Sequence, residues 1–243
     1  MPHVAIVAAV KRELRPLLRS WNRVEIKYGT HRYAAYESPK LEAVAIFGGM
    51  GTEAARIASE AVLTLGKPEW LISAGFAGAL KPGWKAGDVF APRFIVDSVT
   101  GSKYSAGGGA GILLTSHDVH DAASKKMVAE SSDAEAVDME GSAVADVALK
   151  HGVKFAAVKA ISDEHQTVLP PLVKFIRPGG KFSTAAFLAA AATRPEWWSS
   201  ILALSGNSSR ASKSLSRELE SILRSRDWEK LKRLCCSPGQ GQH

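Results

Sequence analysis

The chain has 243 residues, of which 46% are hydrophobic and 23% are charged. This composition is typical of a folded domain with a sizeable core, and it excludes disordered, collagen-like and disulfide-scaffold proteins. The formal net charge is +7, but the residues from Ser199 onward hold eight Lys and Arg against four Asp and Glu, so the preceding body is nearly neutral. We therefore expect no nucleic-acid partner. The basic tail is interpreted as a solvated face, and peripheral contact with a membrane surface is the alternative.

Targeting signals are not evident. The longest apolar run, residues 185–192, is far too short to cross a bilayer, and no charged leader precedes the first apolar run. Cys235 and Cys236 are neighbours, which disulfide geometry rarely allows, so they indicate a reducing compartment. We expect a cytoplasmic protein without a transmembrane segment.

Up to residue 161, short apolar runs alternate with amphipathic segments, which is typical of alternating strands and helices. We predict strands over residues 4–9, 24–28, 32–38, 41–47, 70–74, 88–99, 112–115 and 154–161. Helices are predicted from Thr52 to Leu65, with Thr52 as the N-cap, and from Asp138 to Gly152. This order predicts an α/β fold in which helices flank both faces of a mixed or mostly parallel central sheet.

After Ser162 the chain changes to a proline-containing loop and then to helices, predicted over residues 183–193, 196–204 and from Ser208. The last helix carries Leu215, Leu219, Ile222 and Leu223 on one side, so we expect it to pack on the domain or on a second subunit. The predicted organisation is a main domain of residues 1–194, an all-helical extension of residues 195–236 and a disordered tail of residues 237–243.

Four segments follow predicted strands and should meet at the carboxyl edge of the sheet, where such folds bind ligands. They are residues 10–13, 48–51, 75–78 and 162–164. Two are glycine-rich and two are acidic. Glycines expose backbone N–H groups to a ligand, and carboxylates accept from sugar hydroxyls or exchange protons.

Other local motifs are less specific. Residues 49–54 fit the G-x-G-x-x-A form of a dinucleotide-binding turn, but the next strand lacks the acidic residue that would bind a ribose, so an oxidoreductase is disfavoured. His117 and His120, with Asp118 and Asp121, could form a metal cluster, but their place before a polar helix favours a solvated cap. We expect no metal.

Two motifs carry the strongest signal: Asp138-Met139-Glu140 and Ile161-Ser162-Asp163. With Glu13 and residues 49–51, 72–78 and 87–89, they occur in the order found in the purine nucleoside phosphorylase and methylthioadenosine/S-adenosylhomocysteine nucleosidase superfamily. The chain resembles this superfamily from Val4 to about Asp163. Residues 169–171 and the helical end resemble most its hopanoid-associated phosphorylase group, which is linked to removal of adenine from adenosylhopane.

The resemblance implies two catalytic residues: Glu13 would activate water, and Asp163 would donate a proton to purine N7. Glu140 would bind ribose hydroxyls, Met139 would lie against the sugar, and Lys159 would supply a supporting charge. The resemblance implies further substrate contacts at Gly49, Gly75, Phe76, Val119 and Ser162. Taken singly, Glu13, Glu140 and Asp163 also fit ordinary helix-start or turn carboxylates, but all three together favour a site.

The residue types suit this chemistry. Cleavage of a purine from ribose passes through a state in which the sugar gains positive charge and the base gains negative charge. A carboxylate at Glu140 favours the developing positive charge, and desolvation behind residues 155–161 favours the neutral, proton-donating form of Asp163.

The chain also departs from the superfamily. Ser73 stands where phosphorylases carry an arginine, and Phe76 stands where a serine binds phosphate, so the phosphate cradle is incomplete unless Arg12 and Arg15 substitute. Lys159 replaces an arginine, which keeps the charge without the guanidinium fork. Residues 100–111 are short and glycine-rich, so we expect a remodelled pocket wall against the 5′ substituent.

We therefore expect an enzyme that cleaves the N-glycosidic bond of a purine, adenine-type nucleoside, with hydrolysis favoured over phosphorolysis. A 5′-modified adenosine such as adenosylhopane is the candidate substrate. No cofactor is expected, and inorganic phosphate would be a co-substrate under phosphorolysis. We expect a homodimer or higher homo-oligomer. The alternative is a non-catalytic nucleoside-binding or interaction protein on the same fold.

Overall fold

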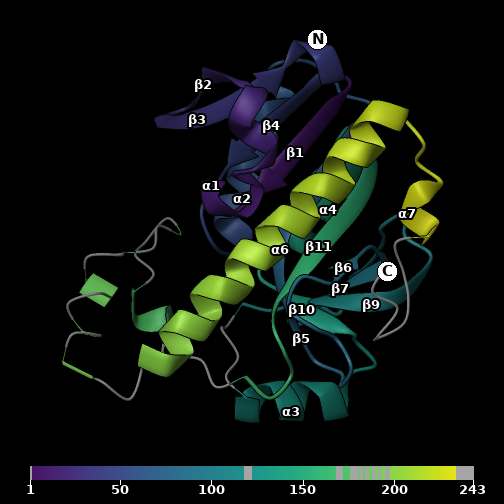
Figure 1. The fold of residues 1–243 in the computed structure, drawn as a ribbon. Coiled ribbons are helices and arrows are strands. Elements are labelled where there is room, and N and C mark those ends of the chain that lie inside the picture. Colours follow the sequence, from purple (N-terminus) through teal and green to yellow (C-terminus); the bar gives the residue numbers. More distant parts are fainter. Residues whose placement is uncertain are drawn as a thin grey trace.

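The fold is that of a computed structural model (Figure 1). It describes residues 2–117, 122–167, 172–175, 180, 183, 186–187, 190, 193–194 and 198–233. The strands within this part of the chain are β1 (Val4–Ala8), β2 (Asn22–Tyr28), β3 (His31–Ser38), β4 (Ala43–Phe47), β5 (Trp70–Ala79), β6 (Val89–Phe90), β7 (Pro92–Asp97), β8 (Lys103–Ser105), β9 (Ala110–Thr115), β10 (Ala136–Asp138) and β11 (Lys154–Asp163). The helices are α1 (Lys11–Leu14), α2 (Thr52–Leu63), α3 (Ala122–Ser131), α4 (Gly141–His151), α6 (Trp198–Ser225) and α7 (Lys230–Arg233), with 3-10 turns at Leu17–Ser20, Pro39–Leu41 and Leu172–Phe175.

One mixed sheet organises the described residues. Its strand order is β2-β3-β4-β1-β5-β10-β9-β7-β8, and β11 pairs with β5 and β6. The central strands β4, β1, β5 and β11 are parallel, whereas β2, β3 and β4 pair antiparallel. The predicted α/β fold is confirmed. The carboxyl ends of β1 and β4 meet directly, because Gly48 N–H donates to the Ala8 carbonyl at 3.1 Å and Gly49 N–H to the Ala9 carbonyl at 3.0 Å.

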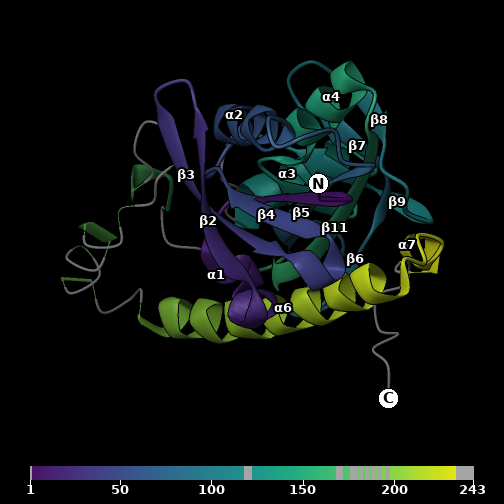
Figure 2. The same ribbon diagram turned by 90° about the horizontal axis from the view of Figure 1, so that it is seen from above.

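Helices cover both faces of the sheet, which lies between them in Figure 2. α2 and α4 pack on one face, where Val62 and Val144 enter a core with side chains of β1 and β4. α6 crosses the other face beside α1 (Figures 1 and 2). Its predicted apolar residues Leu215, Leu219, Ile222 and Leu223 are at most 3% exposed and share a core with β1, β5 and β11. That stripe therefore packs on this chain's own domain.

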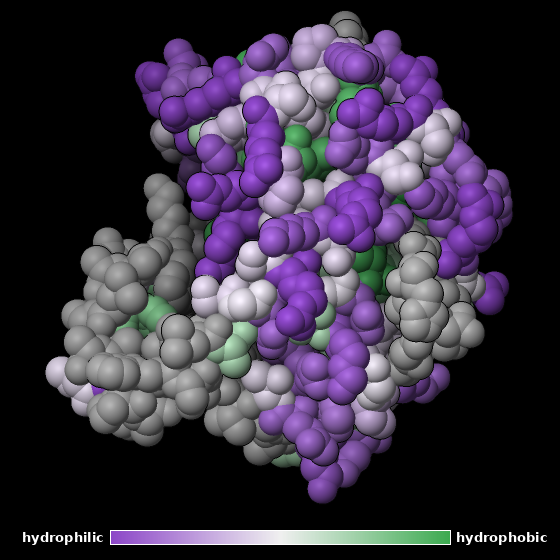
Figure 3. Space-filling view, viewed as in Figure 1, coloured by the Kyte–Doolittle hydropathy of each residue, from purple (hydrophilic) through white to green (hydrophobic). Residues whose placement is uncertain are grey.

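The surface on the α6 side is mainly hydrophilic (Figure 3). This agrees with an amphipathic helix whose apolar stripe faces inward. No helix in the described ranges is long and apolar enough to span a membrane.

The strand predicted to end at Ala74 continues to Ala79. Gly75 and Gly78, which suggested a turn, do not adopt the left-handed backbone. β1 pairs with β5 only as far as Ser73. Beyond that point β11 continues to pair with β5 as far as Gly78, and β10 pairs with Gly78 and Ala79. The backbone groups of this glycine-rich stretch therefore keep strand partners.

Other helix and strand boundaries differ from those predicted from the sequence, for local reasons. The helix predicted from Asp138 begins at Gly141, because Asp138 closes β10. Gly51, with φ 96°, is the N-cap of α2 in place of Thr52. The helices predicted over residues 196–204 and from Ser208 form the single helix α6, which continues through Gly206. The strand predicted from residue 41 starts at Ala43, after a 3-10 turn. The predicted helix over residues 183–193 and the predicted tail lie largely or wholly outside the described residues.

Candidate active site

Glu13 is a buried carboxylate at the carboxyl end of β1, and it is 5% exposed. Its Oε2 accepts the N–H of Val10 and its Oε1 accepts the N–H of Phe76, both at 2.9 Å. Gly75 provides the necessary space, because a Cβ there would lie 2.8 Å from Oε1. Burial raises the pKa of Glu13 above its ordinary value, although the two N–H groups and the charge of Lys159 oppose the rise. The result is an oriented carboxylate with increased proton affinity.

Lys159 is the cation that faces this carboxylate, and it is 1% exposed. Its Nζ lies 2.8 Å from Asp138 Oδ2 and donates to Ser73 Oγ at 2.9 Å. Burial opposes its charge, but the carboxylates of Asp138 and Glu140 outweigh burial and raise the pKa of Lys159. The lysine is therefore held charged and already bonded.

Glu140 is the N-cap residue of α4 and is half-buried. Its Oε1 accepts the N–H of Gly51 at 2.9 Å, which joins α4 to the glycine turn after β4. Burial and the charge of Asp138 raise the pKa of Glu140 to about 7, against the opposing charge of Lys159. Near neutral pH this carboxyl therefore exists in both protonation states.

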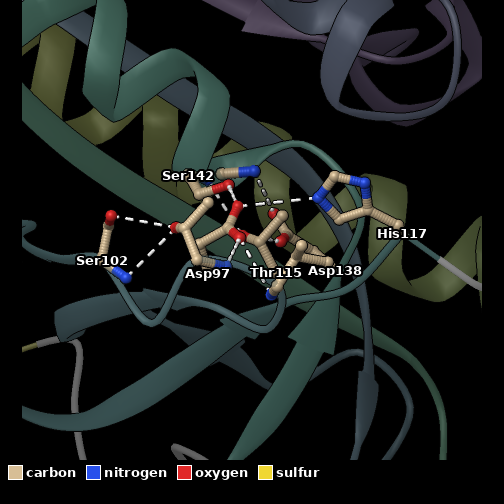
Figure 4. A network of polar contacts seen from close by, with 9 residues as sticks. Asp97, Ser102, Thr115, His117, Asp138 and Ser142 are labelled. Carbon is tan, nitrogen blue, oxygen red and sulfur yellow. Dashed lines mark hydrogen bonds and ion pairs between the residues drawn. The ribbon is translucent and has the colours of Figure 1, made fainter.

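A polar network positions the start of α4 (Figure 4). Asp138 accepts from Thr115 Oγ1 at 2.8 Å and from the Gly141 N–H at 2.9 Å. Asp97 accepts from Ser142 Oγ at 2.7 Å, and His117 Nε2 lies 3.7 Å from its Oδ2. Burial alone would raise the pKa of Asp97, but the hydrogen bond from Ser142 and those from the Thr100 and Val99 backbone lower it to about 2. The network holds α4, and with it Glu140, in place.

Asp163 ends β11 and is 6% exposed. Ser162 Oγ donates to its Oδ1 at 2.6 Å, and Lys125 Nζ forms an ion pair with its Oδ2. Lys125 belongs to α3, and its side chain is 2% exposed. The carboxylate expected to donate a proton therefore faces a buried ammonium.

A cavity of about 850 Å³ opens beside the glycine turn that holds Glu140. Its wall combines aromatic and aliphatic side chains with basic groups from the β2–β3 hairpin and α1. The lining includes Lys11, His31, Arg32, Tyr33, Tyr36, Phe47, Met50, Gly51, Ile57 and His117. The volume lies within the range of small-molecule sites.

The structure places the predicted site residues in several groups. Glu13 lies against Gly75 and accepts the Phe76 N–H, and the charge of Lys159, which pairs with Asp138, acts on both Glu13 and Glu140. Gly49 lies in the adjacent turn, Met139 is half-buried before Glu140, and Ser162 bonds Asp163. Val119, His120 and the cysteine pair lie outside the described residues.

Arg12 and Arg15 are the candidate substitutes for the missing phosphate ligands. Both are exposed, whereas Glu13 between them is buried. Within the described ranges, no group of three His, Cys, Asp or Glu side chains is placed to hold a metal.

Several polar residues of the network were not predicted. Asp97 and Thr115 end the parallel strands β7 and β9. The strand-end rule used for the other turns would have found Thr115, which ends the predicted strand 112–115, whereas Asp97 fell inside the predicted strand 88–99. Lys125 gives no signal in the sequence, because it is one of two adjacent lysines in α3 and nothing in the sequence distinguishes it from Lys126.

Comparison with known proteins adds the family. The model of the phosphorylase superfamily matches residues 3–129 and 111–191. The chain belongs to this superfamily. The expectation of an enzyme of the nucleosidase or phosphorylase class is thereby confirmed.

Individual members of the superfamily share only 14–25% of their residues with this chain. The chain is 25% identical over 196 residues to a 5′-methylthioadenosine/S-adenosylhomocysteine nucleosidase of Buchnera aphidicola, covering 66% of this chain and 83% of that protein. Its fold is similar to that of futalosine hydrolase of Helicobacter pylori, with a TM-score of 0.68, 14% identity, and coverage of 92% and 98% of the two chains. A methylthioadenosine/S-adenosylhomocysteine nucleosidase of Neisseria meningitidis gives a TM-score of 0.67 at 18% identity, covering 93% and 100%. These two structures support the fold.

Proposed function

We propose that this enzyme hydrolyses the N-glycosidic bond of a purine, adenine-type nucleoside. The observation that carries the proposal is the state of Glu13. Its carboxylate is buried, has a raised pKa and is oriented by two backbone N–H groups, which suits a group that takes a proton from an attacking water. Glu140 would bind the ribose hydroxyls, and the neighbouring carboxylates would favour the positive charge that the sugar gains.

The charges of the site favour water over phosphate as the attacking group. A phosphate beside Glu13 would meet the carboxylates of Asp138 and Glu140. Lys159, the cation among them, is already bonded to Asp138 and Ser73. A neutral water avoids this repulsion.

We propose a 5′-modified adenosine, such as adenosylhopane, as the substrate. The Buchnera relative is named for two adenosines that carry 5′ substituents. The cavity beside Gly51 is large enough for a nucleoside with such a group, and Phe47, Met50 and Ile57 offer it apolar contacts. An apolar 5′ chain should therefore raise kcat/KM above that of adenosine by tenfold or more, roughly the effect of burying two methylenes.

The test is incubation of the purified protein with adenosine and with 5′-alkylthio-adenosines, with and without inorganic phosphate. Adenine and sugar products are separated by chromatography. We expect adenine release that does not depend on phosphate. The sugar product should be free ribose, or the 5-alkylthioribose from the modified substrates, in place of the corresponding 1-phosphate. A strict phosphate requirement would make the enzyme a phosphorylase, and binding of adenosine without release of adenine would favour the non-catalytic alternative.

We also propose that the enzyme is a cytoplasmic homo-oligomer. Its mass in solution, measured by light scattering, tests the assembly, and a monomer at micromolar concentration would contradict it.

A further inference from the structure

Lys125 is a buried lysine of α3. Its side chain is 2% exposed, whereas that of the next residue, Lys126, is 79% exposed. Removing an ammonium from water costs several kcal/mol unless a partner compensates. In Figure 1, α3 lies close to the end of β11, and there Lys125 meets Asp163.

The pair is fitted closely into the sheet. Lys125 Nζ contacts Asp163 Oδ2 and donates to the Glu164 carbonyl at 3.2 Å. A Cβ at Gly78 would lie 2.8 Å from Asp163 Oδ2 and 3.0 Å from Lys125 Cε, so the glycine lets the pair approach β5. Asp163 Oδ1 is occupied by Ser162. Asp163 Oδ2 therefore faces Lys125 Nζ, a group that carries N–H donors and no acceptor.

We propose that Lys125 is the source of the proton that the departing purine receives, relayed through Asp163. The proposal rests on the proposed function of Asp163 at the purine. An oxygen of a carboxylate has two lone pairs, so Oδ2 can contact Lys125 and the base together.

The relay balances as follows for a hydrolysis. The electron pair of the C1′–N9 bond leaves with the purine. One proton moves from Lys125 Nζ to Asp163 Oδ2, and Asp163 passes that proton to N7. The water oxygen bonds to C1′ and gives its proton to Glu13. Neutral Lys125 and protonated Glu13 then return to their starting states by proton exchange with solvent.

The experiment compares Lys125→Met with the matched control Lys126→Met. Turnover is measured on adenosine analogues whose purine carries electron-withdrawing groups, such as 2-fluoroadenosine, because a more acidic leaving base needs less protonation. We expect Lys125→Met to lower kcat on adenosine by about 10²-fold with little change in KM. The loss of kcat should be smaller on analogues with a more acidic leaving base. The kcat of Lys125→Met should therefore depend more steeply on leaving-group acidity than the kcat of wild type. Lys126→Met should behave like wild type.

An equal loss on every analogue would overturn the proposal and make Lys125 a structural partner of Asp163. The double variant Lys125→Met/Asp163→Asn removes both charges and guards against misfolding of the single variant. It should turn over as slowly as Asp163→Asn alone, and a further loss would contradict the relay. If wild type releases no base from any analogue, the proposed function fails before the relay is reached.

Discussion

Glu13 is held at both carboxylate oxygens by backbone N–H groups, so its charge can be removed with little change in shape. Glu13→Gln keeps one oxygen for such a bond but cannot accept a proton from water. We expect hydrolysis of adenosine to fall by about 10²–10⁴-fold, while adenine binding, measured by calorimetry, persists. Equal loss of binding and turnover would instead assign Glu13 a purely structural role.

Gly75 leaves the space that the Glu13 carboxylate occupies. In Gly75→Ala the new methyl would meet Glu13 Oε1 at 2.8 Å, so Glu13 must move from its place beside the Phe76 N–H. We expect kcat to fall at least tenfold, because a displacement of about 1 Å at a reacting group costs up to 10²-fold. Gly29→Ala, for which no atom lies within 4 Å of the new Cβ, is the control for space, although its φ of 55° adds backbone strain. Unchanged kcat in Gly75→Ala would show that the position of Glu13 tolerates this shift.

Glu140 links the site to the pH dependence of stability. Its folded-state pKa is raised from 4.5 to about 7, so the folded state binds this proton more tightly than the unfolded state does. The stabilising contribution is complete below pH 4.5 and is lost as the pH rises to about 7. We expect Glu140→Gln, which stays neutral, to be about 1–3 kcal/mol more stable than wild type at pH 8 and similar at pH 4.

Urea unfolding at both pH values measures this difference. Glu130→Gln is the control, because the Glu130 side chain is 67% exposed. The quantity compared is the difference in unfolding free energy between Glu140→Gln and wild type. If this difference is the same at pH 8 as at pH 4, ionisation of Glu140 does not destabilise the fold.

At the scale of single elements, α6 holds the face of the sheet opposite α2 and α4. Leu219, on the side of α6 that faces the sheet, is fully buried, whereas Leu149 on α4 is 71% exposed. Leu219→Ala should lower the free energy of unfolding by about 2–5 kcal/mol, because it leaves a cavity in the core. Leu149→Ala should change it by less than about 0.5 kcal/mol. Similar losses in the two variants, measured by urea unfolding, would contradict the packing of α6.

The helices and strands differ in how well their own sequences predict them. β1 to β4 and α2 follow from apolar runs and helical periodicity, which are local properties of the chain. The extension of β5 through Gly75 and Gly78 depends on β10 and β11, which come from distant parts of the sequence. The burial of Lys125 likewise depends on where α3 packs. Motif order therefore predicted Glu13, Glu140 and Asp163, whereas Lys125, the charged partner of Asp163, required the assembled fold.

At the scale of the whole molecule, the residues after 194 complete the core. A chain truncated after residue 194 lacks α6 and exposes the apolar face of β1, β5 and β11. Each leucine or isoleucine side chain that loses its burial removes roughly 1.5–3 kcal/mol of stability. We expect aggregation or a changed oligomeric state by light scattering. A soluble truncated protein of unchanged assembly that loses activity only on long-chain 5′ substrates would instead make this segment a lid over the substrate.

The hydrogen bond from Ser212 Oγ to the Arg12 carbonyl, at 2.9 Å, joins residues 200 positions apart. It ties α6 to α1, the short helix that carries Glu13. On the ribosome, the first strand and α1 emerge long before α6 is made, so a nascent chain holds Glu13 without this anchor. The enzyme should therefore become active only after α6 has left the exit tunnel, and until then the bare sheet face is a natural binding surface for a chaperone.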